Sequence, residues 1–154
     1  ISVMPTNLYG VNDNFDLENS HVLPAMMRKF YDAKNNNLDF VELWGTGNVK
    51  REFLFVDDLA DACVYLMDNY NSSEIVNIGT GEDLTIKELA EKIKNIVDFK
   101  GEIRWNTEKP DGTPRKLLDV SKLNNLGWKY KVDLDKGLYL TYNWFKKNYN
   151  GIRK

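Results

Sequence analysis

The sequence predicts one unit of the α/β class, with α+β as the alternative, and three observations carry that prediction. Short apolar runs typical of strands alternate with segments whose apolar residues recur every three or four positions, as in helices. No internal repeat, low-complexity tract or linker rich in Pro, Gly or Ser divides the chain. The 154 residues, 42% of them apolar and 29% charged, have the length and composition of a single ordered domain.

The first elements are expected to be a strand, a polar loop and a helix. The apolar run 1–4 (ISVM) predicts the strand, and the polar segment 5–19 predicts the loop. The helix is expected to start near Ser20, with Asn19 or Ser20 as its cap and Pro24 in its first turn.

Two strands and a second helix are expected next. Residues 40–55 (FVELWGTGNVKREFLF) predict two strands around a turn that contains glycine. Asp57 opens the helix, and helix capping explains its pairing with Asp58. The apolar stripe expected on this helix is Leu59, Ala62, Cys63, Leu66, Met67 and Tyr70.

The third helix has the clearest local signal. Residues 74–81 (EIVNIGTG) predict a strand that ends in a glycine turn, and the helix follows. Thr85 and Glu88 form a capping box at its start. The apolar face expected on this helix is Ile86, Leu89, Ala90, Ile93, Ile96 and Val97.

A strand, a loop and two helices are expected in the remaining chain. Residues 101–105 (GEIRW) predict the strand, and residues 106–116 (NTEKPDGTPRK) predict a long loop built on Pro-Asp-Gly. A short helix over 121–126 is stopped by Gly127, and a final helix covers about 134–149. The residues of the final helix expected to face inward are Leu138, Phe145 and Tyr149.

The composition excludes several classes of protein. The formal charge is −2, with 21 basic and 23 acidic residues spread along the chain, so the basic field that nucleic-acid binding needs is absent. No apolar run approaches the ~20 residues of a membrane span. The single cysteine, Cys63, excludes a disulfide framework and a thiolate metal cluster, and it fits a reducing cytoplasm. No motif for a metal or for a serine nucleophile occurs, so no metal is expected.

His21 is the only histidine and the first candidate for chemistry. On a helix over residues 20–33 it points away from the apolar stripe, on the same side as Arg28. In the first turn the helix dipole disfavours the imidazolium. His21 is therefore either a proton-transfer group or an exposed residue without a role. The stripe itself is Val22, Leu23, Met26, Met27, Phe30 and Ala33.

Two cation-bearing segments are candidate anion sites. Trp44 and Arg51, with Lys50, flank a tight turn and could hold a nucleotide base and its phosphates; a solvated hairpin edge is the alternative. Three cations surround the Pro-Asp-Gly turn and would suit an anion such as pyrophosphate; a solvated loop is the alternative. These three cations are Lys109, Arg115 and Lys116.

Two other features favour structural roles. Cys63 lies on an apolar stripe and is expected to be a buried thiol. The segment 77–81 (NIGTG) lacks the Lys-Ser/Thr of a Walker phosphate loop and the full dinucleotide fingerprint. It therefore predicts a plain strand-to-helix turn.

Five segments carry a family resemblance. They are SVMPTNLYG (2–10), NSHVLPAMMRKF (19–30), WGTGNVKREFLFVDDLADA (44–62), NIGTGEDLTIKELA (77–90) and KPDGTPRKLLDVSKLNNLGW (109–128). Together they resemble the GDP-L-fucose synthases, a branch of the extended short-chain dehydrogenase/reductase family. NSHVLPA and KPDGTPRKLLD are specific to that branch, whereas PTNLYG and VDDLADA also occur in relatives that act on other nucleotide sugars.

The resemblance implies an NADPH-dependent conversion of GDP-4-keto-6-deoxy-D-mannose to GDP-L-fucose. C3 and C5 are epimerised through enolates next to the C4 ketone, which hydride transfer then reduces. Each epimerisation needs one group to remove a proton and another to return it on the opposite face. In the family these groups are a cysteine and a histidine; His21 matches the histidine, and Cys63 does not match the cysteine.

The resemblance also assigns binding residues. The loop along the nicotinamide side of NADP(H), which His21 adjoins, corresponds to Pro5, Thr6, Asn7 and Leu8. Positions that hold the GDP-sugar correspond to Lys29, Trp44 and Arg51, with Lys109 as a cation for the diphosphate. Position 29 is often arginine in the family, so lysine implies a weaker phosphate grip. Phe55 replaces a frequent histidine, with an effect expected on packing only.

The fold that the resemblance implies is the last strands of a Rossmann sheet plus a mixed α/β substrate-binding lobe. Residues 1–154 would be the C-terminal nucleotide-sugar-binding portion. The family's Gly-rich turn does not occur here, and none of the five segments corresponds to its Tyr-x-x-x-Lys pair; the one such spacing, Tyr142 to Lys146, falls in the predicted final helix. We therefore expect the N-terminal NADP-binding portion to be absent from this chain, and the chain alone to be inactive. The start at Ile1, within a predicted strand and without a Met, agrees with a cut chain or a piece of a longer protein.

Three further expectations follow from the resemblance. The full-length protein is expected to be a cytoplasmic homodimer whose contacts come largely from helices of the other half. The strands of residues 1–4 and 74–81 would expose edges and apolar faces, which predicts association or marginal stability. The alternatives are a stand-alone nucleotide-sugar-binding module, and part of an epimerase or dehydratase for a UDP- or dTDP-sugar.

Overall fold

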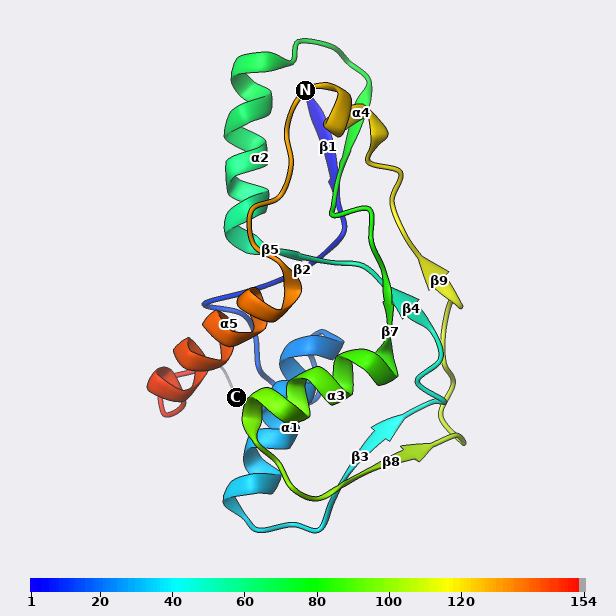
Figure 1. Cartoon of the computed structure of the whole chain (residues 1–154), viewed down its shortest axis with the longest axis vertical. Helices are drawn as coiled ribbons and strands as arrows, with labels where there is room; N and C mark the ends of the chain where they lie inside the picture. The colour runs from blue at the N-terminus through cyan, green and yellow to red at the C-terminus, as the bar shows by residue number, and fades with distance from the viewer. Residues whose placement is uncertain (153–154) are drawn as a thin grey trace.

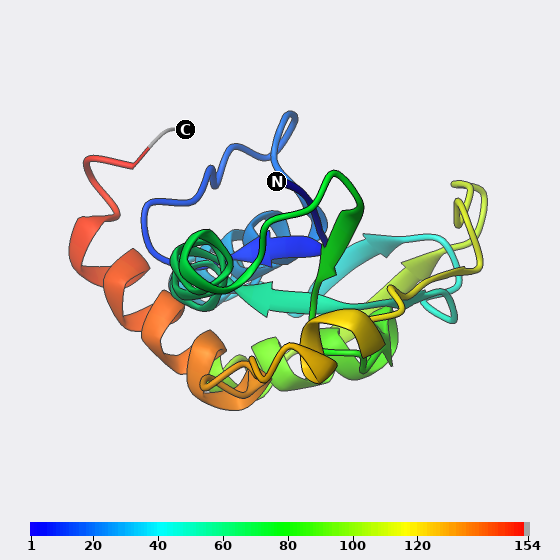
Figure 2. The ribbon, with the colours of Figure 1, turned by 90° about the horizontal axis from the view of Figure 1, so that it is seen from above.

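Helices and short strands alternate along the chain and pack around two apolar clusters (Figures 1 and 2). The computed structural model describes residues 1–152, and its mixture of elements confirms the α/β class. In chain order the elements are β1 (Ser2–Pro5), β2 (Asn7–Tyr9), α1 (Val22–Asn35), β3 (Phe40–Trp44), β4 (Lys50–Arg51), β5 (Phe53–Phe55), α2 (Val56–Asn69), β6 (Ile75–Ile78), β7 (Leu84–Thr85), α3 (Ile86–Val97), β8 (Glu102–Asn106), β9 (Arg115–Lys116), α4 (Ser121–Asn125) and α5 (Leu134–Asn148).

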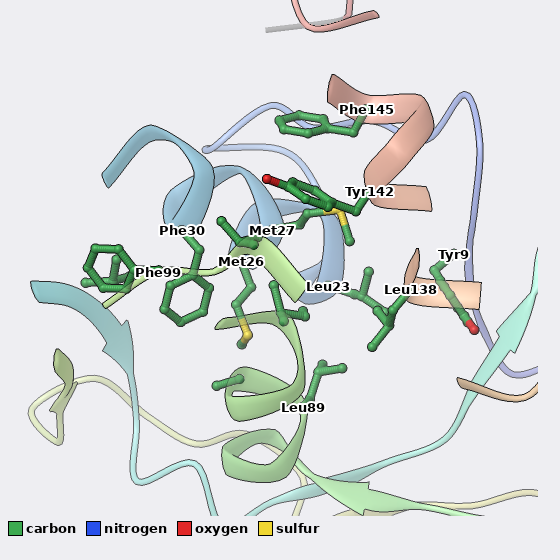
Figure 3. Packing of buried hydrophobic residues seen from close by; sticks show 14 of the residues in the cluster. Tyr9, Leu23, Met26, Met27, Phe30, Leu89, Phe99, Leu138, Tyr142 and Phe145 are labelled. Atoms are coloured by element: carbon green, nitrogen blue, oxygen red, sulfur yellow. The ribbon is translucent and has the colours of Figure 1, made fainter. Parts of the chain in front are cut away.

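The larger cluster forms where α1 and α5 pack against α3 (Figure 3). The predicted stripe of α1 is confirmed from Leu23 onward, since its members are at most 2% exposed. Val22 is the first helical residue and is 42% exposed, so the stripe begins one residue later than predicted. The predicted face of α3 is also buried, with Ile96 only partly covered. This cluster fixes the position of α1, which carries the candidate site residues His21 and Lys29 at its start and on its second turn.

The smaller cluster joins the parallel pair β1–β6 to α2 and α4. Val76 and Ile78 of β6 face it. Cys63 packs against it half-buried, which fits the structural role expected of its thiol, although the burial is incomplete. Met67 is 73% exposed, so its place on the predicted α2 stripe was wrong. The other buried members are Leu54, Ala62, Leu66, Leu123 and Trp128.

The strands expected over residues 40–55 do not pair with each other. β3 runs parallel to β8, with Trp44 opposite Asn106 at the end of the pair. β4 pairs with β7 on one side and β9 on the other, while β5 pairs with β2. The prediction of two paired strands around a turn was therefore wrong, because distant segments of the chain supply the partner strands. β2 and β9 are three and two residues long and lie in segments predicted as loops.

α1 begins later than expected. Its N-cap is His21, with extended backbone (φ −69°, ψ 163°) and no capping hydrogen bond from the side chain. The predicted cap at Asn19 or Ser20 was wrong because both side chains belong to the preceding loop. There the Ser20 hydroxyl donates to the backbone carbonyl of Asp16, and Asn19 Nδ2 donates to Asp16 Oδ1 (3.1 Å).

The starts of α3 and α2 contrast with each other. The capping box of α3 is confirmed: the Glu88 N–H donates to Thr85 Oγ1 (3.1 Å), and the Thr85 N–H donates to Glu88 Oε2 (2.7 Å). The sequence predicted that Asp57 opens α2 and that Asp57 and Asp58 cap it, and this was wrong: the helix begins at Val56, and its N-cap, Phe55, has no side-chain capping hydrogen bond. Asp58 instead lies in the first turn of the helix. Its carboxylate is buried and accepts the backbone N–H groups of Lys131 (3.1 Å) and Val132 (2.9 Å), which ties the segment before α5 to α2. α4 and α5 lie where they were predicted.

One face of the β1–β6 pair is open. Side chains alternate between the two faces along a strand, and residues opposite each other in register share a face. Met4 and Ile75 therefore lie on the side opposite the smaller cluster, and they are 51% and 56% exposed. We expect sedimentation velocity to show self-association that increases with concentration, because exposed apolar strands associate. Ile75→Lys should reduce it, and Tyr139→Lys, which changes an exposed residue of α5, should not. A monomer at every concentration with a reversible thermal transition would contradict this prediction.

Candidate functional site

His21 opens onto a cavity of about 430 Å³ between the β2 segment and the start of α1. The side chain is exposed and lies off the core stripe, as expected. The cavity is lined by Thr6, Asn7, Leu8, Tyr9, Gly10, Val11, Asn12, Asp13, His21 and Val56. Of the four predicted cofactor contacts, three therefore share a cavity with His21. The fourth, Pro5, ends β1 opposite Ile78 and does not line the cavity.

Pairing with β5 positions the β2 side of this cavity. Leu8 lies opposite Leu54 in the parallel pair. The side chains of Asn7 and Thr6 donate to the backbone carbonyl of Glu52, at 2.8 Å and 3.3 Å. These bonds hold the segment expected to pass the nicotinamide against a buried strand.

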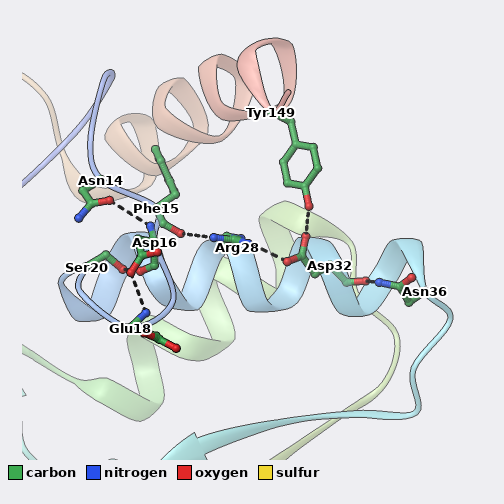
Figure 4. A network of polar contacts seen from close by, with 9 residues as sticks. All are labelled: Asn14, Phe15, Asp16, Glu18, Ser20, Arg28, Asp32, Asn36 and Tyr149. Carbon is green, nitrogen blue, oxygen red and sulfur yellow. Dashed lines mark hydrogen bonds and ion pairs between the residues drawn. The ribbon is translucent and has the colours of Figure 1, made fainter. Parts of the chain in front are cut away.

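A polar network holds the loop that leads into His21 (Figure 4). Asp16 Oδ1 accepts the backbone N–H of Asn19 at 2.7 Å, and this and a second backbone hydrogen bond keep the pKa of Asp16 below its ordinary value. From α1, Arg28 Nη1 donates to the Phe15 carbonyl (3.1 Å). The loop is therefore bonded both within itself and to the helix that His21 caps.

Asp13 adds a carboxyl group to the cavity. Its Oδ1 accepts the N–H of Asn14 (2.7 Å), whereas Oδ2 is buried and has no hydrogen-bond partner among the described residues. Burial raises the pKa of Asp13, while the Asn14 N–H and the charge of His21 act in the opposite direction. An unsatisfied acceptor and an imidazole thus share one cavity, which suits a ligand with polar hydrogens. No local pattern distinguishes Asp13 within its polar loop, so sequence reasoning missed it.

A second group of candidate site residues surrounds the indole of Trp44, which is 65% exposed. Lys29 Nζ lies 5.7 Å and Lys109 Nζ 5.3 Å from the centroid of the indole ring. Burial lowers the pKa of Lys29, and Glu42 opposes that shift. Within residues 1–152, neither lysine forms an ion pair with a carboxylate. Two lysines beside an exposed aromatic face could hold an anionic ligand that has a planar group.

Arg51 lies beside the loop that carries Lys109. Its Nη1 donates to the Lys50 carbonyl (2.7 Å), and its Nη2 would lie 3.8 Å from a β-carbon built on Gly112. The structure therefore brings Lys29 and Lys109 to Trp44 and sets Arg51 at the edge of the same loop.

α1 links the His21 cavity to the group of residues around Trp44. Lys29 follows His21 by eight residues, which is roughly 12 Å along a helix axis. Ser20 and Val22, on either side of His21, line a groove of about 510 Å³ that also contains Lys29 and Trp44. The arrangement suits an elongated ligand with one end at the histidine and the other at the indole.

The predicted anion cluster around the Pro-Asp-Gly turn does not form as a unit. Arg115 and Lys116 make up β9, and Arg115 forms an ion pair with Asp83. Only Lys109 remains on the loop and faces Trp44. The three cations therefore do not all lie on one loop, because the end of the segment predicted as a loop pairs with β4 as a strand.

The NIGTG segment is a structural turn, as predicted. Its N–H groups at Thr80 (2.7 Å) and Gly81 (2.8 Å) donate to Oε1 of the buried Glu52. A carboxylate of the chain itself thus takes the place that a phosphate would need. Over residues 1–152, no helix is long and apolar enough to cross a membrane, and no group of three or more His, Cys, Asp or Glu side chains is placed to hold a metal.

Comparisons with known proteins show the class to which the chain belongs. Residues 1–79 match the NAD dependent epimerase/dehydratase family. A GDP-L-fucose synthetase from Naegleria fowleri, solved with NADP bound, superposes with a TM-score of 0.94 at 34% identity, over 99% of this chain and 48% of that chain. The chain belongs to the NAD dependent epimerase/dehydratase family, with the fold of the extended short-chain dehydrogenase/reductases.

Within that family, its close relatives are GDP-L-fucose synthases. GDP-L-fucose synthase 1 of Arabidopsis thaliana is 62% identical over 148 residues, 96% of this chain and 46% of the relative. The GDP-L-fucose synthase of Escherichia coli K12 is 47% identical over 161 residues, 99% of this chain and 50% of the relative. The chain spans about half the length of the curated relatives it matches and corresponds to their C-terminal part. These relatives confirm the resemblance seen in the sequence.

Proposed function

We propose that residues 1–154 are the nucleotide-sugar-binding portion of an enzyme that converts GDP-4-keto-6-deoxy-D-mannose to GDP-L-fucose, by 3,5-epimerisation and NADPH-dependent 4-reduction. The observation that supports this best is the order of features along α1, from the His21 cavity through the groove to Trp44 and its lysines. That order suits a sugar at His21 and a diphosphate near Lys29 and Lys109. Relatives named GDP-L-fucose synthase support the identity of the sugar nucleotide.

His21 is proposed as one of the two acid/base groups. A base removes the proton from a carbon next to the ketone, the carbonyl takes up the negative charge as an enolate, and a second group protonates the opposite face. The His21 side chain has no hydrogen-bond partner among the described residues, so it is free to meet a substrate carbon. The second group, a cysteine in the family, is proposed to lie in a part of the protein outside residues 1–154.

The residues of the His21 cavity fit the nicotinamide end of NADP(H). The buried, unpaired Oδ2 of Asp13 could accept a hydrogen from an amide or hydroxyl group of the cofactor. The residues proposed to lie along it are Pro5, Thr6, Asn7, Leu8 and His21. When bound, NADPH supplies the hydride that reduces the ketone. Most of the dinucleotide would be held by an N-terminal Rossmann portion of the longer protein.

The whole protein is proposed to be a cytoplasmic homodimer. Residues 1–154 alone are proposed to lack reductase activity, because no segment that resembles the family corresponds to its Tyr-x-x-x-Lys pair. The one such spacing, Tyr142 to Lys146, lies on α5, where Tyr142 is buried in the core. The open face of the β1–β6 pair supports a role as part of a larger unit, since it leaves Met4 and Ile75 uncovered.

Calorimetric titration with GDP and UDP tests the proposal. We expect selective binding of GDP that Arg51→Ala weakens at least about tenfold, because hydrogen bonds to charged groups contribute about 1.5–3 kcal/mol. Arg104→Ala is a matched control, since Arg104 lies on β8 and packs over Phe40. Binding of UDP, or of dTDP titrated in the same way, in preference to GDP would favour an enzyme for another nucleotide sugar. If none of the three binds, the proposed binding of the nucleotide sugar by residues 1–154 is wrong for this chain alone.

A further inference from the structure

Two connections run side by side from the β3–β8 pair toward β4 and β9 (Figure 1). Residues 107–114, here called the Lys109 loop, join β8 to β9, and a shorter connection joins β3 to β4. Backbone hydrogen bonds anchor both ends: the Gly45 N–H donates to the Asn106 carbonyl and the Lys50 N–H to the Pro114 carbonyl, each at 2.9 Å. Every residue of the Lys109 loop is exposed, so apolar packing does not fix its conformation.

The middle of the Lys109 loop is held by one carboxylate. Asp111 Oδ1 accepts the Thr46 N–H at 2.6 Å, and Asp111 Oδ2 accepts the Thr46 hydroxyl at 2.7 Å. These two bonds, here called the Thr46–Asp111 clamp, join residues 65 positions apart. They also hold the pKa of Asp111 below its ordinary value, so the clamp is ionised near neutral pH.

Gly45 permits the clamp to form. Its φ of +78° lies in the left-handed region, and a β-carbon there would come within 2.3 Å of Asp111 Oδ1. The glycine before Thr46 is therefore required both by the turn and by the approach of the carboxylate.

The clamp lies between two positions that face the proposed ligand. Lys109, two residues before Asp111, lies beside Trp44 at 5.3 Å, and Gly112, directly after it, lies next to Arg51. We propose that the Thr46–Asp111 clamp is a positioning element for nucleotide-sugar binding, which holds the Lys109 loop in its binding geometry before the ligand arrives. This inference rests on the proposed function. Its physical basis is preorganisation, since a loop ordered in advance loses less entropy when the ligand binds.

A pair of substitutions at Thr46 tests the clamp. Thr46→Val removes the hydroxyl with little change in shape, whereas Thr46→Ser keeps it. Thr46→Val loses the hydrogen bond to Asp111 Oδ2 and the one that Thr46 Oγ1 accepts from the Asn48 N–H (3.2 Å). We expect GDP affinity about five- to tenfold weaker in Thr46→Val, and within about twofold of the unmodified chain in Thr46→Ser. Both substitutions preserve the backbone N–H of residue 46, and the site is only partly buried, so both variants should fold.

An NMR measurement without ligand separates the clamp from the proposed function. The methylene protons of Lys109 next to Nζ should be shifted by the ring current of Trp44, and Lys109→Arg assigns their signal. In Thr46→Val the signal should move to the position of a free lysine, and in Thr46→Ser it should stay.

Each result decides between supporting and overturning the inference. A Lys109 signal that is unchanged in Thr46→Val would overturn it, as would a lost signal with unchanged GDP affinity. An unmodified chain with a shifted Lys109 signal but no affinity for GDP would overturn the proposed binding and, with it, the positioning role. In that case the failure lies in the function and not in the loop geometry, because the signal shows the loop in place.

Discussion

Replacing Glu52 with alanine is expected to lower the free energy of unfolding by about 3–5 kcal/mol, as is typical of breaking a buried polar network. Glu52 is fully buried. Its Oε1 accepts the N–H groups of Thr80 (2.7 Å) and Gly81 (2.8 Å), and its Oε2 accepts that of Leu118 (3.0 Å). Alanine would remove the acceptor of three partly buried backbone N–H groups. Urea denaturation followed by circular dichroism measures the loss.

Two further variants separate the network from a general effect of charge. Glu52→Gln keeps the volume and one acceptor oxygen, but its amide would face the Leu118 N–H, so we expect a smaller loss of about 1–3 kcal/mol. Glu82→Ala removes an exposed glutamate from the same turn and should change stability by less than about 0.5 kcal/mol. Equal losses at positions 52 and 82, or no loss at 52, would show that the buried carboxylate does not organise the turn.

Glu52 also connects the two halves of the candidate site. Its backbone carbonyl accepts hydrogen bonds from Thr6 and Asn7, which line the His21 cavity. Its neighbour Arg51 lies on β4 at the edge of the Lys109 loop. A change that loosens the Glu52 network should therefore disturb both the cavity and the proposed nucleotide end of the groove.

Local signals in the sequence predicted local structure well. The capping box of Thr85 and Glu88 involves residues three apart, and it marked the start of α3 correctly. The apolar stripe of α1 was correct from Leu23 onward for the same reason, since a helical period is visible within one segment. The prediction of the pairing of β4 failed because its partners, β7 and β9, lie far away in the chain and are only two residues long. No periodicity can be read from a strand of two residues.

The candidate site likewise contains residues that the sequence alone suggested and residues that it did not. Trp44 and Arg51 could be proposed from the sequence because an indole and a guanidinium stand near a glycine turn. Asp111 and Asp13 could not, because their surroundings depend on contacts with residue 46, 65 positions away, and on a cavity formed by β2 and α1. The sequence could show which side chains were available, but not which of them the fold would bring together.

In the full-length protein, His21→Gln is expected to slow solvent-deuterium incorporation at C3 and C5 of the nucleotide sugar by about 10²- to 10⁴-fold, the range typical of losing a general acid or base. The proposed function requires proton transfer at these carbons, and glutamine has the size to fill the position without titrating. His21 faces the cavity, makes no side-chain hydrogen bond among the described residues, and caps α1 through its backbone only. Mass spectrometry of the recovered nucleotide sugar in D₂O measures the exchange.

The structure makes this test sharp, because the substitution should not affect folding. His21 lies outside the apolar core, so the free energy of unfolding should change by less than about 0.5 kcal/mol, and a loss of exchange then reflects chemistry. Asp57→Asn changes an exposed titratable residue next to Val56, which lines the same cavity, and it should leave the exchange unaffected. Exchange at the unmodified rate in His21→Gln would remove the histidine from the mechanism. Its position at the start of α1 would then reflect only the backbone geometry of a helix cap.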